Sequence, residues 1–190
     1  MRHPLALLIP AFWLAWIIYW FAASLSVKPV RRRESAASRA THVIPLLISA
    51  VLLGSPRVAG PLLDGRFMTR SAASFFTGVA LVAAGLLFSV AARVYLGGNW
   101  SGTVTLKQDH TLTRTGPYRY VRHPIYTGIL LAILGSALAL AEWRGLVALA
   151  LVVFAFLRKI RTEEQFMIEQ FGEDYERYRR EVPALVPGVM

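Results

Sequence analysis

Five long apolar stretches constrain what this chain can fold into. A helix needs about 20 apolar residues to cross the hydrocarbon core of a bilayer. The charged fraction is 17%, whereas a soluble domain usually has about 25% charged residues. We therefore predict an all-α integral membrane protein of about five transmembrane helices. The expected spans are residues 5–25, 41–53 (with an extension to 63 left open), 71–96, 125–141 and 145–157.

The expected spans differ in regularity. Pro45 and Gly54 interrupt the second span, which predicts a broken or tilted helix whose freed backbone groups are satisfied by neighbouring helices. The third span is rich in glycine and alanine, and small residues let helix backbones approach closely in lipid. Only Glu142-Trp143-Arg144 separates the fourth span from the fifth, so these two must form an antiparallel hairpin.

The 21 basic residues are distributed unevenly between the segments that join the spans. Cytoplasmic segments of membrane proteins carry an excess of Lys and Arg, and this bias predicts a multi-pass protein with its amino terminus outside and its site facing the cytoplasm. Its size and motifs predict a bacterial inner membrane. The cytoplasmic set is Lys28, Arg31, Arg32, Arg33, Arg39, Arg93, Lys107, Arg114, Arg119, Arg122, Arg158, Lys159, Arg161, Arg177, Arg179 and Arg180. The outside set is Arg2, Arg57, Arg66, Arg70 and Arg144.

Composition excludes several classes of site. The chain has no cysteine, which rules out disulfides, thiolate metal sites and cysteine nucleophiles. The net charge is +10. The basic residues flank apolar runs and form no basic helix, so they predict contact with membrane lipids and no nucleic acid. His3, His42 and His110 have no companion ligands at metal spacing, so we predict no metal. Nothing indicates an obligate protein partner.

Residues 116–128, Gly-Pro-Tyr-Arg-Tyr-Val-Arg-His-Pro-Ile-Tyr-Thr-Gly, form the densest group of functional residue types and run into the fourth span. Pro124 suits the first position of a helix, and His123 suits the cap before it. The opening turn of a helix leaves N–H groups unpaired and carries a partial positive charge. This segment therefore predicts a site for an anionic group, such as a ligand carboxylate.

The same segment has a simpler interpretation. Its tyrosines, with Arg119 and Arg122, could anchor a helix end at the membrane surface. However, Tyr118 and Tyr126 also offer flat faces with hydroxyl tips, and Gly128 allows close backbone approach. The combination of His123 with Tyr126 favours a binding site.

The tail beyond residue 157 is predicted to be helical to about residue 181. On a helix that continues from the fifth span, an apolar stripe at helical spacing includes the carboxylate of Glu164, and Glu163 borders it. A buried charge needs a partner or a function. Arg161 lies one turn before Glu164, so simple pairing along the helix stays open. Phe171-Gly172 should end this helix, and the following Tyr175 and Tyr178 should pack.

These motifs together resemble the isoprenylcysteine carboxyl methyltransferase family, which is related to phospholipid methyltransferases. The resemblance covers about the last half of the chain. It depends on Arg-His-Pro-Ile-Tyr-Thr-Gly at 122–128, the helical hairpin, Glu163-Glu164, Phe171-Gly172, Tyr175, Tyr178 and Val182-Pro183. It implies one membrane methyltransferase domain over residues 1–190, with amino-terminal spans in 1–92 and the cofactor-binding and catalytic half in 93–190.

The resemblance also implies S-adenosylmethionine as cofactor, S-adenosylhomocysteine as product and a lipid-like or prenylated substrate that enters between helices. The tail acid, Glu163 or Glu164, would form the substrate end with an arginine, and both Arg158 and Arg161 are candidates. The implied cofactor residues are His123 and Tyr126, with Tyr118, Gly116, Arg122 and Gly128 in the same segment.

The chemistry of the acceptor stays open. A carboxylate with a pKa near 3.5 is already a nucleophile at neutral pH, so the enzyme need only align it, and an arginine can hold it bidentately. An amine acceptor, as in phospholipid methylation, would need a group to accept its proton, and His123 or Glu164 could serve. Two further alternatives are an NADPH-dependent membrane reductase, since sterol-reductase-like proteins share a similar hairpin region, and a non-enzymatic scaffold.

Overall fold

The computed structural model describes residues 4–25, 30–55, 60, 63–97, 100, 105–107 and 112–189. Arg2, His3, Lys28, Arg57 and His110, which entered the sequence analysis, lie outside these residues. The described elements are a short 3₁₀ turn (Pro4–Leu7), α1 (Leu8–Ser24), β1 (Val30–Arg33), α2 (Ala36–Gly54), α4 (Ala72–Leu96), β2 (Thr105–Lys107), the 3₁₀ turn η3 (Gly116–Arg119), α5 (Pro124–Leu140), α6 (Trp143–Phe171) and α7 (Glu173–Glu181).

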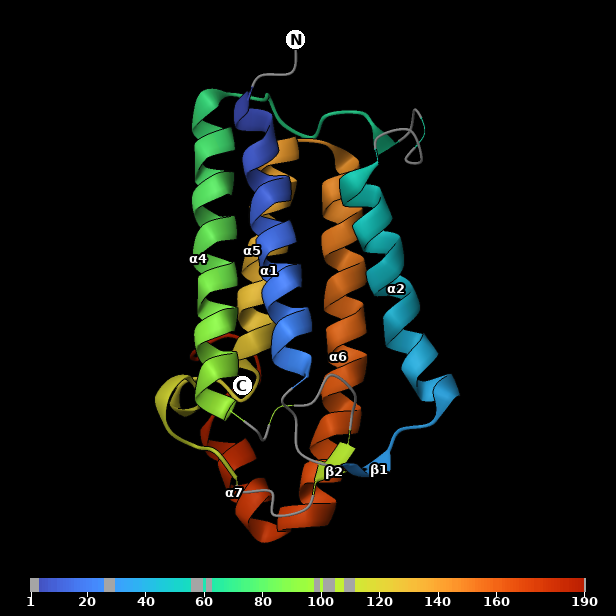
Figure 1. Cartoon of the computed structure of the whole chain (residues 1–190), viewed down its shortest axis with the longest axis vertical. Coiled ribbons are helices and arrows are strands. Elements are labelled where there is room, and N and C mark those ends of the chain that lie inside the picture. The colour runs from blue at the N-terminus through green and yellow to red at the C-terminus, as the bar shows by residue number, and fades with distance from the viewer. Residues whose placement is uncertain are drawn as a thin grey trace.

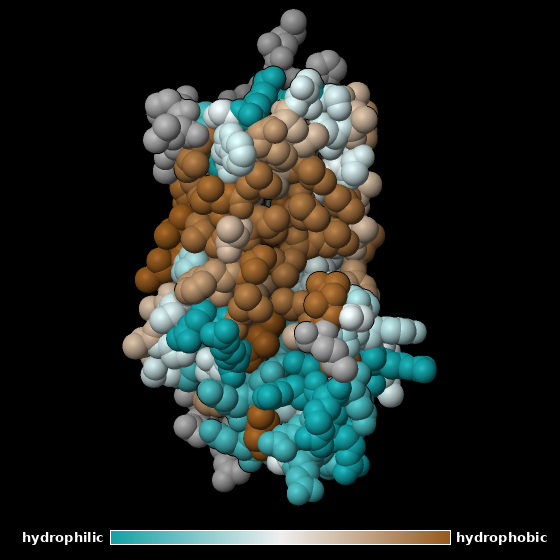
Figure 2. All heavy atoms as spheres, turned by 180° about the vertical axis from the view of Figure 1, so that it is seen from behind, coloured by the Kyte–Doolittle hydropathy of each residue, from teal (hydrophilic) through white to brown (hydrophobic). Residues whose placement is uncertain are grey.

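The helices α1, α2, α4, α5 and α6 run along the long axis of the molecule as one bundle (Figure 1). At one end α6 extends beyond its neighbours, α7 folds back beneath it, and β1 and β2 lie at the same end next to α6. We call this end, formed by α7, the last turns of α6 and the two strands, the polar end. An apolar band covers the middle of the bundle, and hydrophilic residues gather at the polar end (Figure 2).

Helices α4 and α5 form the tightest pair because glycines replace side chains along their contact. A Cβ added to Gly128 would lie 2.5 Å from the carbonyl oxygen of Gly85, and one added to Gly78 would lie 2.5 Å from that of Gly135. The two backbones therefore touch directly, as small residues allow in membrane helices. This confirms the close packing expected of the third span.

The hairpin between α5 and α6 turns within two residues. Ala141 ends α5 in the left-handed conformation, at φ 59°, and α6 begins at Trp143. The buried Arg144 pairs with Glu142 and donates through Nη1 to the carbonyl oxygen of Leu52, at 2.8 Å. A cation at the carboxyl end of α2 satisfies carbonyls that have no intrahelical partner, so this turn also fixes α2.

Helix α2 differs from the sequence-based expectation. It is continuous through Pro45 and begins at Ala36, five residues before the predicted start, because Ser35 caps its amino terminus by accepting from the backbone N–H of Ser38 at 3.2 Å. It ends at Gly54. Ser49 donates to the carbonyl oxygens of Pro45, at 2.7 Å, and of Ala148 on α6, at 3.2 Å.

Helix α1 contacts α4 and α5 through its indoles. Trp13 donates to Ser136 at 3.1 Å, and Trp16 donates to Ser89 at 2.8 Å. The described side chains of α1 include no buried residue. Ile9 and Phe12 also pack on the core that α4 and α5 form. The helix is therefore attached along one face, and much of its other apolar surface is exposed.

The strands β1 and β2 were not predicted, and in this respect the all-α expectation is incomplete. They pair antiparallel, with Val30 opposite Lys107 and Arg33 opposite Thr105. Both segments are short and polar and lie far from each other in the sequence, so no periodic pattern predicts them.

Two of the described helices, α2 and α4, are long and apolar enough to cross a membrane. Helices α1 and α5 are apolar but have 17 residues each. In α6 the apolar segment 145–157 continues into a charged segment without a break. The helical architecture agrees with the prediction, whereas the number of spans stays a prediction.

Candidate functional site

The segment that opens α5 and the charged part of α6 meet at the polar end. Arg122, just before α5, donates through Nε and Nη2 to the same oxygen, Oε1 of Glu164, at 2.8 Å in each case. Both side chains are about one-tenth exposed, at 10% and 11%. This ion pair links the segment before α5 to α6, and removing either partner would leave a largely buried charge without that compensation.

Glu164 also contacts the imidazole of His123, whose Nε2 lies 3.2 Å from Oε1. The residue lies beyond the apolar part of α6 and is 8% exposed. Burial raises its pKa, but the hydrogen bond and charge of His123 and the guanidinium of Arg122 outweigh burial, so the pKa of Glu164 lies below its ordinary value. Glu164 is therefore ionised at neutral pH.

The neighbouring Glu163 binds a different set of partners. Tyr126 donates its hydroxyl to Oε1 at 2.6 Å, Lys159 Nζ lies 3.8 Å from the same oxygen, and His123 Nδ1 lies 3.6 Å from Oε2. His123 thus lies between the two glutamates, which we call the acidic pair. The sequence predicted His123, Tyr126 and this pair separately, and the structure brings all four together.

Aromatic rings form one wall of this site. The rings of His123 and Tyr126 are parallel within 3°, with centroids 5.5 Å apart, and Tyr126 stacks on Phe156 of α6 at 4.5 Å. The ammonium group of Lys159 lies 5.4 Å from the centroid of the Tyr126 ring. Stacking fixes the tyrosine, so its hydroxyl points at Glu163 in a defined orientation.

The tail returns along the opening of α5. The N–H groups of Arg122 and His123 donate to the carbonyl oxygens of Pro183 and Ala184, at 2.9 and 3.0 Å. Arg122 also donates to the carbonyl oxygens of Arg179 and Val182. Gly172, with φ 54°, ends α6 before this tail begins. In the tail, the buried Tyr178 donates to the carbonyl oxygen of Tyr118 at 2.5 Å. The expected helix end and the packing of Tyr175 and Tyr178 are confirmed.

Three predicted cofactor residues lie outside the contacts of the acidic pair. Gly128 occupies the α4–α5 contact described above. Gly116 adopts φ +59° where η3 begins, with the ring of Tyr95 within 2.6 Å of the position its Cβ would take. Tyr118 is buried, and its hydroxyl reaches the carbonyl oxygen of Ala92 at 3.4 Å. Gly128 therefore packs between helices, and the other two lie at the turn before α5; their part in cofactor binding stays a prediction.

The two arginines predicted to pair with the tail acid, Arg158 and Arg161, are exposed. Neither makes an ion pair with Glu163 or Glu164 within the described residues. The neighbouring cations are Arg122 and Lys159. The spacing of Lys159 and Glu163, i and i+4 on one helix, was a signal that could have identified the lysine.

Arg93, whose role the sequence left open, is an anchor. It is 4% exposed and donates to the carbonyl oxygens of Ala23 and Gly97, at 2.9 Å each. Its guanidinium lies 4.3 Å from the ring centroid of Trp100. These contacts join the ends of α1 and α4, so Arg93 supports the bundle beside the site.

Comparison with known proteins identifies relatives of this chain. A model of the phospholipid methyltransferase family matches residues 73–174. Protein-S-isoprenylcysteine O-methyltransferase of Schizosaccharomyces pombe is 37% identical over 99 residues, which are 50% of this chain and 42% of the relative. The human enzyme of that name is 33% identical over 114 residues, 58% of this chain and 40% of the relative. Cobalt-zinc-cadmium resistance protein CzcN of Cupriavidus metallidurans is 30% identical over 147 residues, 76% of this chain and 60% of the relative.

A solved structure shares the fold. The eukaryotic intramembrane Ras methyltransferase, isoprenylcysteine carboxyl methyltransferase, superposes with a TM-score of 0.52 and 21% identity, over 80% of this chain and 52% of that chain. The matches to the first curated relatives span between 42% and 58% of their lengths.

Fold and site together define a small helical membrane protein with an acidic and aromatic site at its polar end. The chain belongs to the phospholipid methyltransferase family. Within that family, the resemblance to isoprenylcysteine carboxyl methyltransferases predicted from the motifs is confirmed by the relatives and by the shared fold.

Proposed function

We propose that this protein transfers a methyl group from S-adenosylmethionine to a lipid-like acceptor embedded in the membrane. The acceptor atom is an oxygen of a carboxylate of the isoprenylcysteine type. The observation that carries the proposal is the acidic pair, Glu163 and Glu164, held by Arg122, His123 and Tyr126 where an apolar bundle meets its polar end. The family and its named relatives favour methyl transfer over a reductase or a scaffold.

The residues at the site fit the chemical groups of the proposed donor, which when bound supplies a methyl group on a positively charged sulfonium. The ring of Tyr126 attracts cations, as the ammonium group of Lys159 at 5.4 Å from its centroid illustrates. The acidic pair can accept hydrogen bonds from hydroxyl or ammonium groups. The opening turn of α5 can receive a carboxylate. We assign donor contacts to His123 and Tyr126, with Tyr118 and Gly116 supporting the segment.

The acceptor end lies on the α6 side of Tyr126. Arg122 donates to Glu164 and to two tail carbonyls, so its guanidinium is already committed, and Arg158 and Arg161 are exposed. Lys159 lies beside Glu163 and Tyr126. We therefore assign recognition of the acceptor carboxylate to Lys159. Since such a carboxylate is ionised at neutral pH, the residues must align it and exclude water, and no general base is required.

Methylation of a phospholipid amine is the second candidate, because the family model carries that description. An amine must lose a proton before or during transfer. Glu164 has a lowered pKa and holds Arg122, which makes it a poor proton acceptor, whereas His123 could accept one. The names of the curated relatives, which are O-methyltransferases, favour the carboxylate.

For the architecture we propose five spans, with α1, α2, α4, α5 and the apolar part of α6 crossing the membrane. The amino terminus would lie outside, and the polar end would face the cytoplasm of a bacterial inner membrane. Residues 1–92 would supply amino-terminal spans, and residues 93–190 the site. The helical fold, the apolar band and the positive-inside rule support this arrangement.

Calorimetric titration of the detergent-purified protein with S-adenosylhomocysteine, alongside NADPH, tests the proposal. We expect saturable binding of the first ligand and at least about tenfold weaker binding by His123→Ala, a difference of ~1.4 kcal/mol. Arg161→Ala, an exposed residue of the same end, is the matched control and should bind as the wild type does. Binding of NADPH alone would replace the methyltransferase with a reductase, and binding of neither ligand would leave a scaffold.

A further inference from the structure

The chain changes character where α7 ends. Most residues of α7 carry a charge, whereas residues 182–189, Val-Pro-Ala-Leu-Val-Pro-Gly-Val, include no polar side chain. The function proposed above uses none of these side chains. An apolar segment that follows a highly charged helix needs a contact of its own, because exposing it to water has no energetic benefit.

The first half of this segment lies along the opening of α5, and we call residues 182–185 the strap. Its carbonyl oxygens accept from the N–H groups of Arg122 and His123, as described above. That of Leu185 accepts from the hydroxyl of Thr127 at 2.7 Å. The side chains of the strap are all half-buried. Hydrogen bonds therefore carry much of its attachment, and water competes for hydrogen bonds that it can reach.

The second half, residues 186–189, forms a turn that presents two valines to the outside. Gly188 has φ 79° and follows Pro187, and the N–H of Val189 donates to the carbonyl oxygen of Val186 at 3.1 Å. These are the features of a type II β-turn, whose first and last residues lie close together. Val186 is 54% exposed and Val189 is 62% exposed. Scattered apolar residues are ordinary on a surface, but here an ordered turn brings two of them together.

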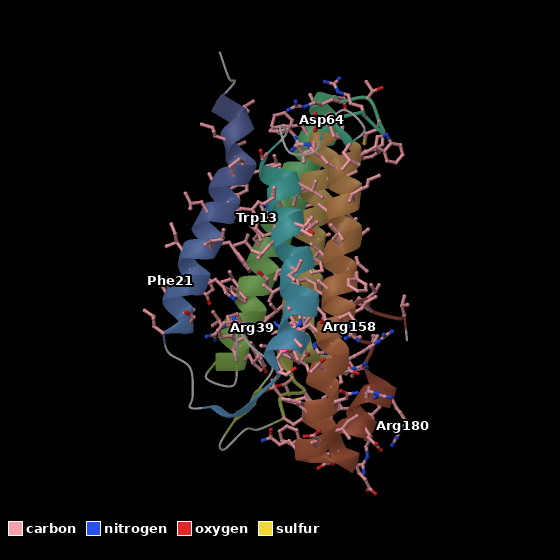
Figure 3. All side chains as sticks on the ribbon, turned by 90° about the vertical axis from the view of Figure 1, so that its right-hand side faces the viewer. Trp13, Phe21, Arg39, Asp64, Arg158 and Arg180 are labelled. Atoms are coloured by element: carbon pink, nitrogen blue, oxygen red, sulfur yellow. The ribbon has the colours of Figure 1, made fainter. Side chains whose placement is uncertain are left out.

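This turn lies where the apolar band meets the polar end. Thr127, which holds Leu185, is in the first turn of α5, a helix without a charged side chain. The dark red trace that follows α7 returns to the height of Arg158, whereas Arg180 on α7 lies farther from the bundle (Figure 3). Arg158 is the first charged residue after the apolar segment of α6. The turn is therefore level with the point where the proposed spans would leave the hydrocarbon.

We propose that the turn at residues 186–189 inserts its valines into the interfacial layer of the bilayer and thereby fixes the strap at its second end. Helix α7 fixes the first end. The boundary between lipid headgroups and acyl chains suits this turn, because it buries apolar side chains and still supplies water and headgroups to the backbone. The inference rests on the proposed spans and is independent of methyl transfer and of the acceptor.

The absence of cysteine from the chain allows a fluorophore to be attached at one position at a time. Val189→Cys is labelled and reconstituted into phosphatidylcholine vesicles. Leu47→Cys, at a 61% exposed position of α2, is the control within a proposed span, and Arg180→Cys, at an exposed position of α7, is the control in water. Nitroxides on the lipid near the headgroup should quench the label at 189 at least about threefold more than the label at 180. Iodide on both sides of the membrane should show the opposite ranking.

Each other outcome contradicts the proposal. Quenching at 189 by iodide as strong as at 180, with no quenching by the lipid, would place the turn in water. Shielding of the label at 189 from both quenchers would assign the turn to a protein contact, with a second copy of the chain if the shielding grows with protein density. Absence of lipid quenching at 47 would refute the proposed spans and this inference with them. Methyl transfer is tested separately, by the titration with S-adenosylhomocysteine.

Hydrogen exchange in the same vesicles tests the effect on the strap. The double variant Val186→Asp, Val189→Asp should withdraw the turn from the interface, because carboxylates prefer water. The amides of Arg122 and His123, which donate to the strap, should then exchange at least about fivefold faster. Val186→Leu with Val189→Leu keeps the turn apolar, is the matched control and should exchange as the wild type does. Equal exchange in all three proteins would show that the strap does not depend on the turn, and would overturn the proposal.

Discussion

Tyr126 on α5 donates its hydroxyl to Glu163 on α6 at 2.6 Å, while its ring stacks with those of His123 and Phe156. One side chain therefore has two separable functions, a flat face and a hydroxyl. Tyr126→Phe should keep affinity for S-adenosylhomocysteine within about threefold, because the stacked ring remains, whereas Tyr126→Ala should lose at least about tenfold. Calorimetric titration measures both. Equal loss in the two variants would show that the hydroxyl, and not the ring, holds the donor.

The cation that recognises the acceptor can be identified by exchanging adjacent residues. Lys159→Met should raise the KM for a carboxylate acceptor at least about tenfold, since it removes the charge beside Glu163. Arg158→Met, one residue earlier and exposed, should change KM less than about twofold. Lys159→Arg should recover part of the loss. The reverse ranking in initial-rate measurements would return the assignment to Arg158.

Arg122 connects Glu164 with the tail. Arg122→Gln should destabilise the protein by about 3–5 kcal/mol, because Glu164 remains buried without its partner, and should expose the tail to limited proteolysis. Thermal unfolding in detergent, followed with and without protease, measures both effects. Arg161→Gln is the exposed control. A normal unfolding temperature with an intact tail in Arg122→Gln would contradict the structural role of this pair.

Acid should loosen the same contact. The pKa of Glu164 is lowered in the folded state, so the stability that it contributes is complete above the ordinary carboxyl pKa of 4.5 and is lost as pH falls below that value towards the folded pKa. The unfolding temperature should therefore fall as the pH is lowered beyond about 4.5. In Glu164→Gln this part of the drop should disappear. An unchanged acid profile in that variant would assign the drop to other carboxyls.

The contact between α4 and α5 predicts a difference between two glycines. Gly128→Ala places a Cβ 2.5 Å from the carbonyl oxygen of Gly85 and should destabilise the protein by about 1–3 kcal/mol through overpacking. Gly54→Ala has nothing within 4 Å of its new Cβ and should change stability by less than about 0.5 kcal/mol. Thermal unfolding in detergent compares them. Similar stability of both variants would contradict the direct backbone contact.

Much of the fold and part of the site could be predicted from the sequence, because apolar runs and helix caps are local signals. The end of α6 at Gly172 and the hairpin at Glu142 followed from such signals. His123, Tyr126 and the acidic pair were predicted separately, and their meeting is a contact between segments that are distant in sequence. The start of α2 was missed because its cap, Ser35, lies in a segment whose basic residues indicated a loop.

The remaining features depend on contacts between residues that are distant in sequence. Gly128 sits in a motif typical of binding, yet only the position of Gly85 on α4 shows that it serves packing. Arg161 has the right spacing from Glu164, but it lies on the exposed side of α6, and Arg122 approaches from another element. Pairings of this kind cannot be read from periodicity along a single helix.

The two halves of the bundle are built by different means. Along α4 and α5, backbone touches backbone at Gly85 and Gly128, so separating them would break contacts that no side-chain rotation can replace. Helix α1 is attached by side chains: its indoles donate to two serines, Ile9 and Phe12 pack on α4 and α5, and Arg93 of α4 donates to Ala23. A long hydrocarbon chain moving in the plane of the bilayer therefore meets a rigid wall on one side and an adjustable one on the other. On the proposed function, side chains along α1 would turn to admit the lipid, and the residues at the polar end would keep their positions.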